Sequence, residues 1–168
     1  MDLVPLFVKL AGRRVEVDGT GWVAASKLDA LVRAGADIHV VDPDAFVSSD
    51  LDEAWYVVSA ATTEINARVA EAAEARRIFV NAVDDPPHAS AYLGGVIRRA
   101  GVTIAISTSG EAPALAGLLR EGIDALLPPD LDRWAECARD KRRAWKATGV
   151  PMDERRPQLI EALKALYP

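Results

Sequence analysis

Apolar and polar residues alternate along the first part of the chain in a pattern that predicts strands and helices in turn. Residues 13–19 carry apolar side chains at every second position and run into glycine, which is typical of a strand entering a tight turn. Residues 22–35 have the spacing of an amphipathic helix that ends at Gly35, and residues 37–42 form the next expected strand. This succession predicts a βαβ unit with glycines in its first turn.

The alternation continues further along the chain and then changes character. Residues 55–62 form an apolar run suited to a strand covered on both faces, residues 63–77 a helix capped by Thr62 or Thr63, and residues 78–87 a strand that two prolines end. We therefore expect an α/β fold with a shortened, Rossmann-like parallel sheet. A strand over 101–110 and helices over 112–127, 131–147 and 153–166 are expected to follow.

The connection between the second and third strands is short. Only residues 43–54 separate Asp42 from the strand that starts near Trp55, where a complete Rossmann half would place a helix, a strand and a second crossover. An extended residue spans about 3.3 Å, so this segment can still return along one strand and cross to its neighbour. We expect it to lack a full helix and to leave part of one sheet face uncovered, with Glu16 and Asp18 pointing toward solvent.

Composition limits the classes of function. The chain has 168 residues, half of them hydrophobic, and a formal net charge of −5, which argues against broad nucleic-acid binding. Cys137 is the only cysteine, so one chain forms no internal disulfide and no cysteine-based metal cluster. The N-terminus has no secretory pattern and no segment suits a membrane span, so we expect a cytoplasmic protein. The basic stretch 139–146 is either a solvated helix face or a surface that attracts a polyanionic small molecule.

The glycines of the first turn follow the dinucleotide-binding pattern Gly19-x-Gly21-x-x-Ala24. The first glycine makes the tight turn, the second lets the backbone approach a diphosphate, and the third small residue lets helix pack on strand. Asp42, which ends the second strand, is placed to bind ribose hydroxyls and to repel a 2′-phosphate, which favours NAD over NADP. Asp18 beside this turn is expected to weaken diphosphate binding, and the alternative is a turn that only connects strand and helix.

Polar residues also cluster where a later strand ends. Asn81, Asp84 and Asp85 follow the strand over 78–87, and the carboxyl ends of parallel strands are where α/β sheets bind ligands. A carboxylate there can act as a general base or hold a cation. The alternative is that the Asp-Asp-Pro-Pro sequence forms a turn for local reasons only.

A second polar cluster, residues 107–110, has the sequence Ser-Thr-Ser-Gly and precedes a helix. Its hydroxyls and backbone N–H groups suit a carboxylate-bearing ligand, and N-capping of the helix is the alternative. His88 is the only histidine near these clusters, and we expect it to be a solvent-exposed loop residue rather than a metal ligand.

Four stretches taken in order carry a family resemblance: residues 5–27, 57–73, 79–86 and 103–128. Together the chain resembles the precorrin-2 dehydrogenase and sirohydrochlorin ferrochelatase family, which supplies the N-terminal part of sirohaem synthase. The resemblance implies NAD-dependent dehydrogenation of precorrin-2 to sirohydrochlorin and, in some members, insertion of ferrous iron as a second substrate. It also implies a homodimer and three regions: an NAD-binding region over 1–85, a dimerisation region over 86–115 and a helical region over 116–168.

The resemblance, together with the glycine pattern and the charge of the substrate, assigns roles to particular residues. Asp84 is the expected base of the dehydrogenation and the candidate metal ligand, although no metal site is certain. The residues expected to hold NAD are Gly19, Thr20, Gly21, Trp22, Val23, Asp42, Ala61 and Thr62. The residues expected to bind the tetrapyrrole are Asn81, Ser107, Thr108, Ser109, Arg120, Arg142 and Arg143. Two alternatives remain open: an enzyme that only inserts metal, and a non-catalytic tetrapyrrole-binding dimer that has lost NAD.

Overall fold

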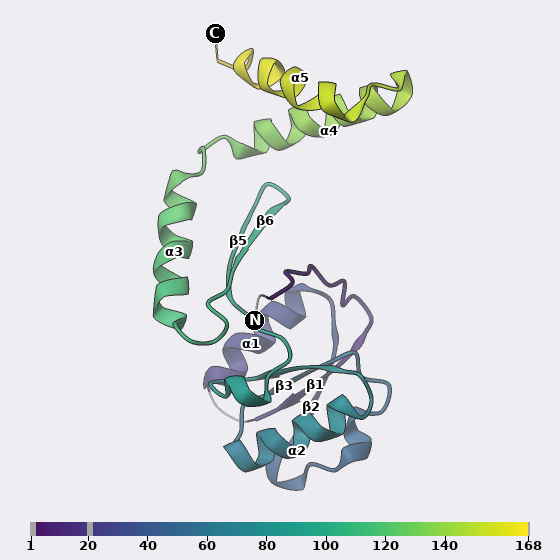
Figure 1. Cartoon of the computed structure of the whole chain (residues 1–168), viewed down its shortest axis with the longest axis vertical. Coiled ribbons are helices and arrows are strands. Elements are labelled where there is room, and N and C mark those ends of the chain that lie inside the picture. The colour runs from purple at the N-terminus through teal and green to yellow at the C-terminus, as the bar shows by residue number, and fades with distance from the viewer. Residues whose placement is uncertain (1–2, 20–21, 168) are drawn as a thin grey trace. The chain divides into compact units, whose positions relative to one another are not determined.

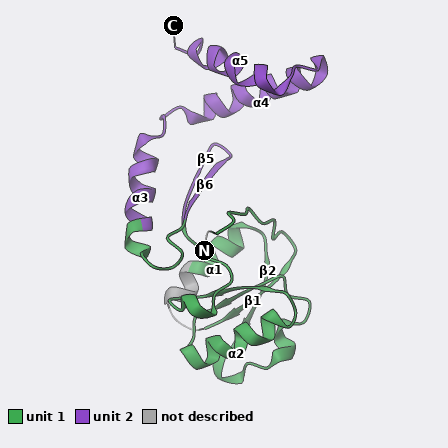
Figure 2. Cartoon of the chain, in the orientation of Figure 1, with its two compact units in different colours: residues 1–94, 107–115 green, residues 95–106, 116–168 purple. Residues whose placement is uncertain are grey.

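A computed structural model of the chain describes residues 3–19 and 22–167, with side chains described in 3–19 and 27–167. The chain divides into two compact units (Figure 2). The first unit holds residues 1–94 and 107–115, and the second unit holds residues 95–106 and 116–168. The region boundaries expected from the sequence, after residues 85 and 115, stay predictions.

The first unit is built on a parallel sheet of four strands in the order β2-β1-β3-β4. Figure 1 labels β1, β2 and β3 of this sheet, with α1 and α2. Its main elements are β1 (Arg14–Asp18), α1 (Trp22–Arg33), β2 (Asp37–Val41), β3 (Tyr56–Ser59), α2 (Thr63–Glu74) and β4 (Phe79–Ala82). The predicted fold class, a shortened Rossmann-like parallel sheet, is confirmed. Thr62 caps α2, as predicted, because its Oγ1 accepts a hydrogen bond from the N–H of Ile65.

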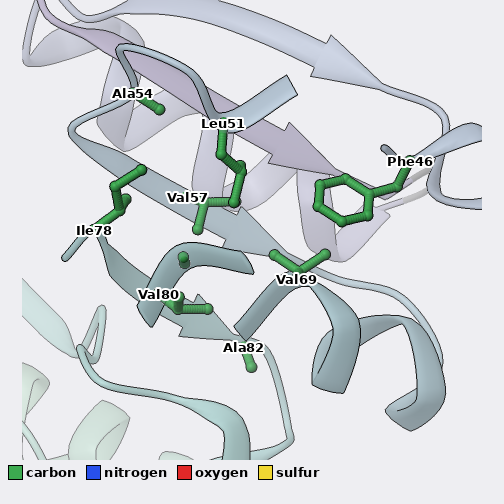
Figure 3. Close-up of a cluster of buried hydrophobic side chains, with 9 residues drawn as sticks. Phe46, Leu51, Ala54, Val57, Val69, Ile78, Val80 and Ala82 are labelled. Carbon is green, nitrogen blue, oxygen red and sulfur yellow. The ribbon is translucent and has the colours of Figure 1, made fainter. Parts of the chain in front are cut away.

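Both faces of this sheet are covered by apolar side chains. On one face, Val15 and Val17 pack in a cluster with Leu31 of α1. On the other face, Val57 packs in a cluster with Val69 of α2 (Figure 3). Strand residues point alternately to the two faces, so the residues between the β1 valines share the face that α2 covers.

The short connection after β2 covers part of that same face. It contains two 3₁₀ helices, η1 (Pro43–Ala45) and η2 (Ser48–Leu51). Phe46 and Leu51 are buried there beside Val57 (Figure 3). The expectation that Glu16 and Asp18 point toward solvent is therefore wrong, since both side chains are 0 % exposed. The segment lacks a full helix, as predicted, but its two apolar side chains belong to the buried cluster on this face.

The second unit contains a hairpin and helices. Its elements are β5 (Gly95–Arg99), β6 (Val102–Ile106), most of α3 (Pro113–Leu126), α4 (Leu131–Thr148) and α5 (Met152–Lys164). The antiparallel strands β5 and β6 are joined by Ala100 and Gly101, which both have positive φ, as in the two-residue turns that match strand twist. Arg99 ties the hairpin to α3 by donating to the backbone oxygens of Asp124 and Pro128. No helix in the described part of the chain is long and apolar enough to cross a membrane.

Candidate dinucleotide and tetrapyrrole site

The carboxyl end of the parallel sheet gathers most of the predicted site residues of the first unit. The β1 strand ends at Asp18, β2 leads into Asp42, β3 leads into Ala61, and β4 leads into Asp84. Because the strands are parallel, all four ends meet at one edge of the sheet. This edge is where open α/β sheets bind ligands.

Gly19 makes the first turn at this edge with a backbone conformation and a close contact that leave no room for a side chain. Its φ is +137°, and a Cβ atom at this position would lie 2.7 Å from the backbone oxygen of Ala60. The turn therefore has the first glycine that a dinucleotide site requires. Thr20 and Gly21 lie outside the described residues, as do the side chains of Trp22 and Val23, so their cofactor roles stay predictions.

Asp42 lies at the end of β2, next to β1, with an exposed side chain. Its Oδ1 accepts a hydrogen bond from the backbone N–H of Asp44 at 3.1 Å, which fixes the carboxylate at the start of η1. No partner is described for its Oδ2 in the parts of the chain that the structure covers. The carboxylate is thus held in place with one oxygen available, which fits a group that accepts hydrogen bonds from ribose hydroxyls.

Two carboxyl groups lie buried beneath the turn. Oε1 of Glu16 lies 2.6 Å from Nη2 of Arg14. Burial raises the pKa of Glu16, and the guanidinium of Arg14 partly offsets that rise. Burial raises the pKa of Asp18 to about 7, with smaller contributions from the negative charges of Glu16 and Asp50. Neither oxygen of Asp18 has a hydrogen-bond partner among the described residues. Below about pH 7 Asp18 is therefore mostly neutral, so it places little charge near a bound diphosphate.

Ala61 and Thr62 connect β3 to α2 at the same edge. The backbone N–H of Ala61 donates to Oδ1 of Asn66 at 3.4 Å, and the Thr62 hydroxyl is used in capping α2. These contacts fix the backbone of the connection. Contact of Ala61 and Thr62 with the cofactor stays a prediction.

The three polar residues predicted after β4 lie in different environments. Asp84 is exposed, has a φ of +56°, and makes no described hydrogen bond. Asn81 is buried, and its Nδ2 donates to the backbone oxygen of Ala91 at 3.1 Å, so it holds the following loop in place. Asp85 is buried and hydrogen-bonded. The structure thus leaves Asp84, of these three, free to meet a ligand.

A buried chain of hydrogen bonds lies behind this loop. Oγ of Ser59 donates to Oδ1 of Asn66 at 2.8 Å, and Nδ2 of Asn66 donates to Oδ2 of Asp85 at 3.1 Å. Oδ1 of Asp85 lies 2.9 Å from Nδ1 of His88. The side chain of His88 is 30 % exposed, so it is partly exposed to solvent, and its pairing with buried Asp85 holds it against the protein.

Sequence reasoning missed Ser59 and Asn66, although one signal was available. Asn66 lies three positions before Val69 and seven before Ala73, on the stripe of α2 that faces the core. A polar residue on a buried stripe needs hydrogen-bond partners, and such a position marks a polar network.

The segment 107–110 lies beside the loop that follows β4. A Cβ atom at Gly110 would lie 3.2 Å from Cγ of Pro86, so the two backbones pass closely within the first unit. Oγ of Ser107 accepts from the N–H of Ser109, and Oγ1 of Thr108 accepts from the N–H of Ala112. These hydroxyls therefore shape the turn before α3, and their contact with a tetrapyrrole stays a prediction.

The three predicted arginines lie in the second unit. Arg120 on α3 pairs with Glu121 at 3.0 Å, and Arg143 on α4 pairs with Asp140. Arg142 on α4 is exposed. Their part in a common site with the first unit stays a prediction. Among the described residues, no group of three or more His, Cys, Asp or Glu side chains is arranged to hold a metal ion.

A parallel α/β sheet whose first strand ends in an obligatory glycine is the architecture of a dinucleotide-binding domain. Residues 6–95 match the family described as "Putative NAD(P)-binding", and the chain belongs to that family.

Curated relatives extend the similarity beyond this domain. The chain is 39 % identical over 158 residues to siroheme synthase 1 of Serratia proteamaculans, which covers 82 % of this chain and 33 % of the relative. It is 38 % identical over 176 residues to siroheme synthase 1 of Yersinia enterocolitica, which covers 93 % of this chain and 37 % of the relative. The chain thus spans about a third of the length of these relatives.

A solved structure described as "SirC, precorrin-2 dehydrogenase" has the same fold. It aligns with a TM-score of 0.67 at 19 % sequence identity, covering 95 % of this chain and 88 % of that one. At this identity the likeness concerns the fold.

Proposed function

We propose that this protein catalyses the NAD-dependent dehydrogenation of precorrin-2 to sirohydrochlorin, in the cytoplasm. The similarity to siroheme synthases and the fold shared with a precorrin-2 dehydrogenase support this proposal. The observation that carries it is structural. The dinucleotide turn at Gly19, the exposed Asp84 and the segment 107–110 belong to one compact unit, and the last two are joined through the close approach of Gly110 and Pro86.

NAD fits the residues present. Gly19 has the backbone conformation that the turn requires, and Asp42 has an oxygen available for the ribose. The carboxylate of Asp42 would repel a 2′-phosphate, which favours NAD over NADP. When bound, the nicotinamide accepts the hydride that the substrate loses.

Each unit contributes residues to the proposal. Asp84 lies exposed at the sheet edge, where the resemblance places the base of the dehydrogenation. Precorrin-2 is a polycarboxylate, so the cationic side chains of Arg120, Arg142 and Arg143 would attract and hold it.

The homodimer implied by the resemblance is also part of this proposal. Several leucines of α3 expose 43–84 % of their surface: Leu115, Leu118, Leu119 and Leu126. Exposed apolar rows of this kind are typical of association surfaces. We propose that α3 contributes to the contact between two copies.

An anaerobic assay with precorrin-2 and NAD tests the main proposal. Sirohydrochlorin should form, with its absorbance rising together with that of NADH, and an inactive wild type would refute the dehydrogenase assignment. Adding ferrous iron to sirohydrochlorin tests the second reaction. Metal insertion without saturable NAD binding would favour the chelatase-only alternative, and tetrapyrrole binding without either reaction would favour the non-catalytic dimer.

A further inference from the structure

The hydrogen-bond chain from Ser59 to His88 fixes the orientation of each of its members. Oδ1 of Asn66 accepts from both Oγ of Ser59 and the backbone N–H of Ala61, so the amide nitrogen of Asn66 must face Asp85. Ser59, Asn66 and Asp85 are at most 8 % exposed. A polar network that is buried to this degree holds its side chains rigidly when its donors and acceptors are matched.

This network specifies which nitrogen of His88 carries the proton. Oδ2 of Asp85 accepts from Asn66, and Oδ1 lies 2.9 Å from Nδ1 of His88. A carboxylate only accepts hydrogen bonds, so Nδ1 of His88 is the donor. The neutral ring then has its lone pair on Nε2, which makes no described hydrogen bond. A buried carboxylate that holds an imidazole in one tautomer is the arrangement that prepares a general base.

The position of the ring relates this base to the proposed site. His88 belongs to η3 (Pro86–His88), which follows β4 at the carboxyl edge of the sheet, four residues after Asp84. The same short helix contains Pro86, against which Gly110 packs. Asp84 is exposed and makes no described hydrogen bond, whereas the imidazole is held by a chain of three buried side chains. The better-oriented proton acceptor of this loop is therefore His88.

We propose that His88 is a further proton-accepting residue of the dehydrogenation, and that Asp85 is its positioning residue. In the dehydrogenation the tetrapyrrole would lose a hydride to NAD and a proton to Nε2 of His88 as its new double bond forms. The imidazolium that results would be stabilised by the charge of Asp85. The imidazolium then returns the proton to water. The dehydrogenation releases one proton, so Asp84 would then bind the substrate and not act as the base that the resemblance implies. This role rests on the proposed function and names a residue that the family resemblance did not supply.

The charged groups described around the His88 imidazole are carboxylates. Asp85 is its only described ionic partner, and from α2 the amide of Asn66 reaches this network. Two other carboxylates lie on the adjoining segments, Asp84 in the loop and Glu64 at the start of α2, and neither hydrogen-bonds to the ring in the described structure. Substitution of His88 therefore removes one titratable group and leaves these carboxylates in place.

The tautomer can be measured without substrate. The chain has two histidines, so the ¹⁵N resonances of each ring are assigned by H88Q and H39Q. His39 is the matched control, because it also pairs with an aspartate, but in an exposed pair: its Nε2 lies 3.3 Å from Oδ2 of Asp37. In the neutral wild type we expect His88 to show a protonated Nδ1 and an unprotonated Nε2, and D85N should abolish this preference. A His88 ring protonated at Nε2, or exchanging between tautomers, would refute the arrangement.

Kinetics test the use of this base. In H88Q we expect kcat to fall about 10²-fold or more with KM little changed, since general bases contribute about 10²–10⁴-fold. In H88Q the decrease of kcat toward acid pH should also disappear. Added imidazole should partly restore the activity of H88A, and H39Q should have wild-type kinetics. Wild-type turnover with an unaltered profile in H88Q would leave Asp84 as the acceptor and refute this role alone. A wild type without turnover would refute the proposed function and this role with it.

Discussion

Glu16 and Asp18 lie two residues apart on one face of β1, both wholly buried, and of the two only Glu16 has a described cationic partner. A neutral carboxyl survives such burial more easily than a carboxylate, because an unpaired charge is costly in an apolar environment. The strand beneath the dinucleotide turn therefore contains a group whose charge depends on pH near neutrality.

Stability should fall as the pH rises toward 7. The pKa of Asp18 is about 7 in the folded chain against an ordinary value of 3.8, so the unfolded chain loses the proton first. The stabilising contribution is complete below about pH 4, declines as pH rises, and is lost above about pH 7. The free energy of unfolding, measured with denaturant, should be lower at pH 8 than at pH 5 by on the order of 2–4 kcal/mol. The raised pKa of Glu16 contributes in the same direction.

Replacing this carboxyl by an apolar side chain should remove much of that dependence. D18V is expected to raise the free energy of unfolding at pH 8 by a few kcal/mol, on the order of the pKa shift it removes, and to change it little at pH 4. E71V, at an exposed position of α2, is the control. A D18V protein with the wild-type pH dependence would show that Asp18 is not the group responsible.

Dinucleotide selectivity should depend on Asp42. D42A is expected to weaken NAD binding by about tenfold or more, because a lost hydrogen bond to a charged group costs about 1.5–3 kcal/mol. The variant should also show a smaller preference for NAD over NADP. Titration calorimetry with both dinucleotides measures the two effects. D44A is the matched control, because the Asp44 side chain is exposed and its backbone supplies the contact to Asp42. Equal NAD affinities of D42A and wild type would contradict the assignment.

The close approach of the two loops should make Gly110 sensitive to substitution. G110A places a Cβ atom 3.2 Å from Pro86 and from Tyr92 at a φ of +78°, so it is expected to destabilise the protein by about 1–2 kcal/mol. G117A in α3 has nothing within 4 Å and should stabilise its helix slightly. Thermal unfolding of the two variants makes the comparison, and equal melting temperatures would argue against the packing of these loops.

The proposed dimer should depend on the exposed row of α3. L118K combined with L126K removes two of its most exposed apolar side chains and is expected to shift the protein from dimer to monomer. V32K, at a similarly exposed position on α1, should leave the assembly unchanged. Sedimentation at several concentrations distinguishes these outcomes, and a double variant that stays dimeric would place the interface elsewhere.

Local patterns were enough to predict much of the first unit. Alternating apolar residues in β1, the continuous run in β3 and the capping residue of α2 depend on near neighbours, so they can be recognised in the sequence. The hairpin strand β5 was missed, because Arg98 and Arg99 interrupt its apolar pattern. The polar positions Asp42, Asp84 and Ser107–Ser109 were found because they follow strands, and strand ends are visible locally.

Contacts between distant segments could not be read in the same way. The sequence by itself determined a parallel α/β sheet with a glycine turn and polar residues at its carboxyl edge, since these follow from periodicity and chain direction. Only the tertiary structure decided that Glu16 and Asp18 are wholly buried, and that Ser59, Asn66, Asp85 and His88 form one network. The reason is physical: burial and side-chain pairing depend on which segments meet across the fold, and residue spacing along the chain does not specify that.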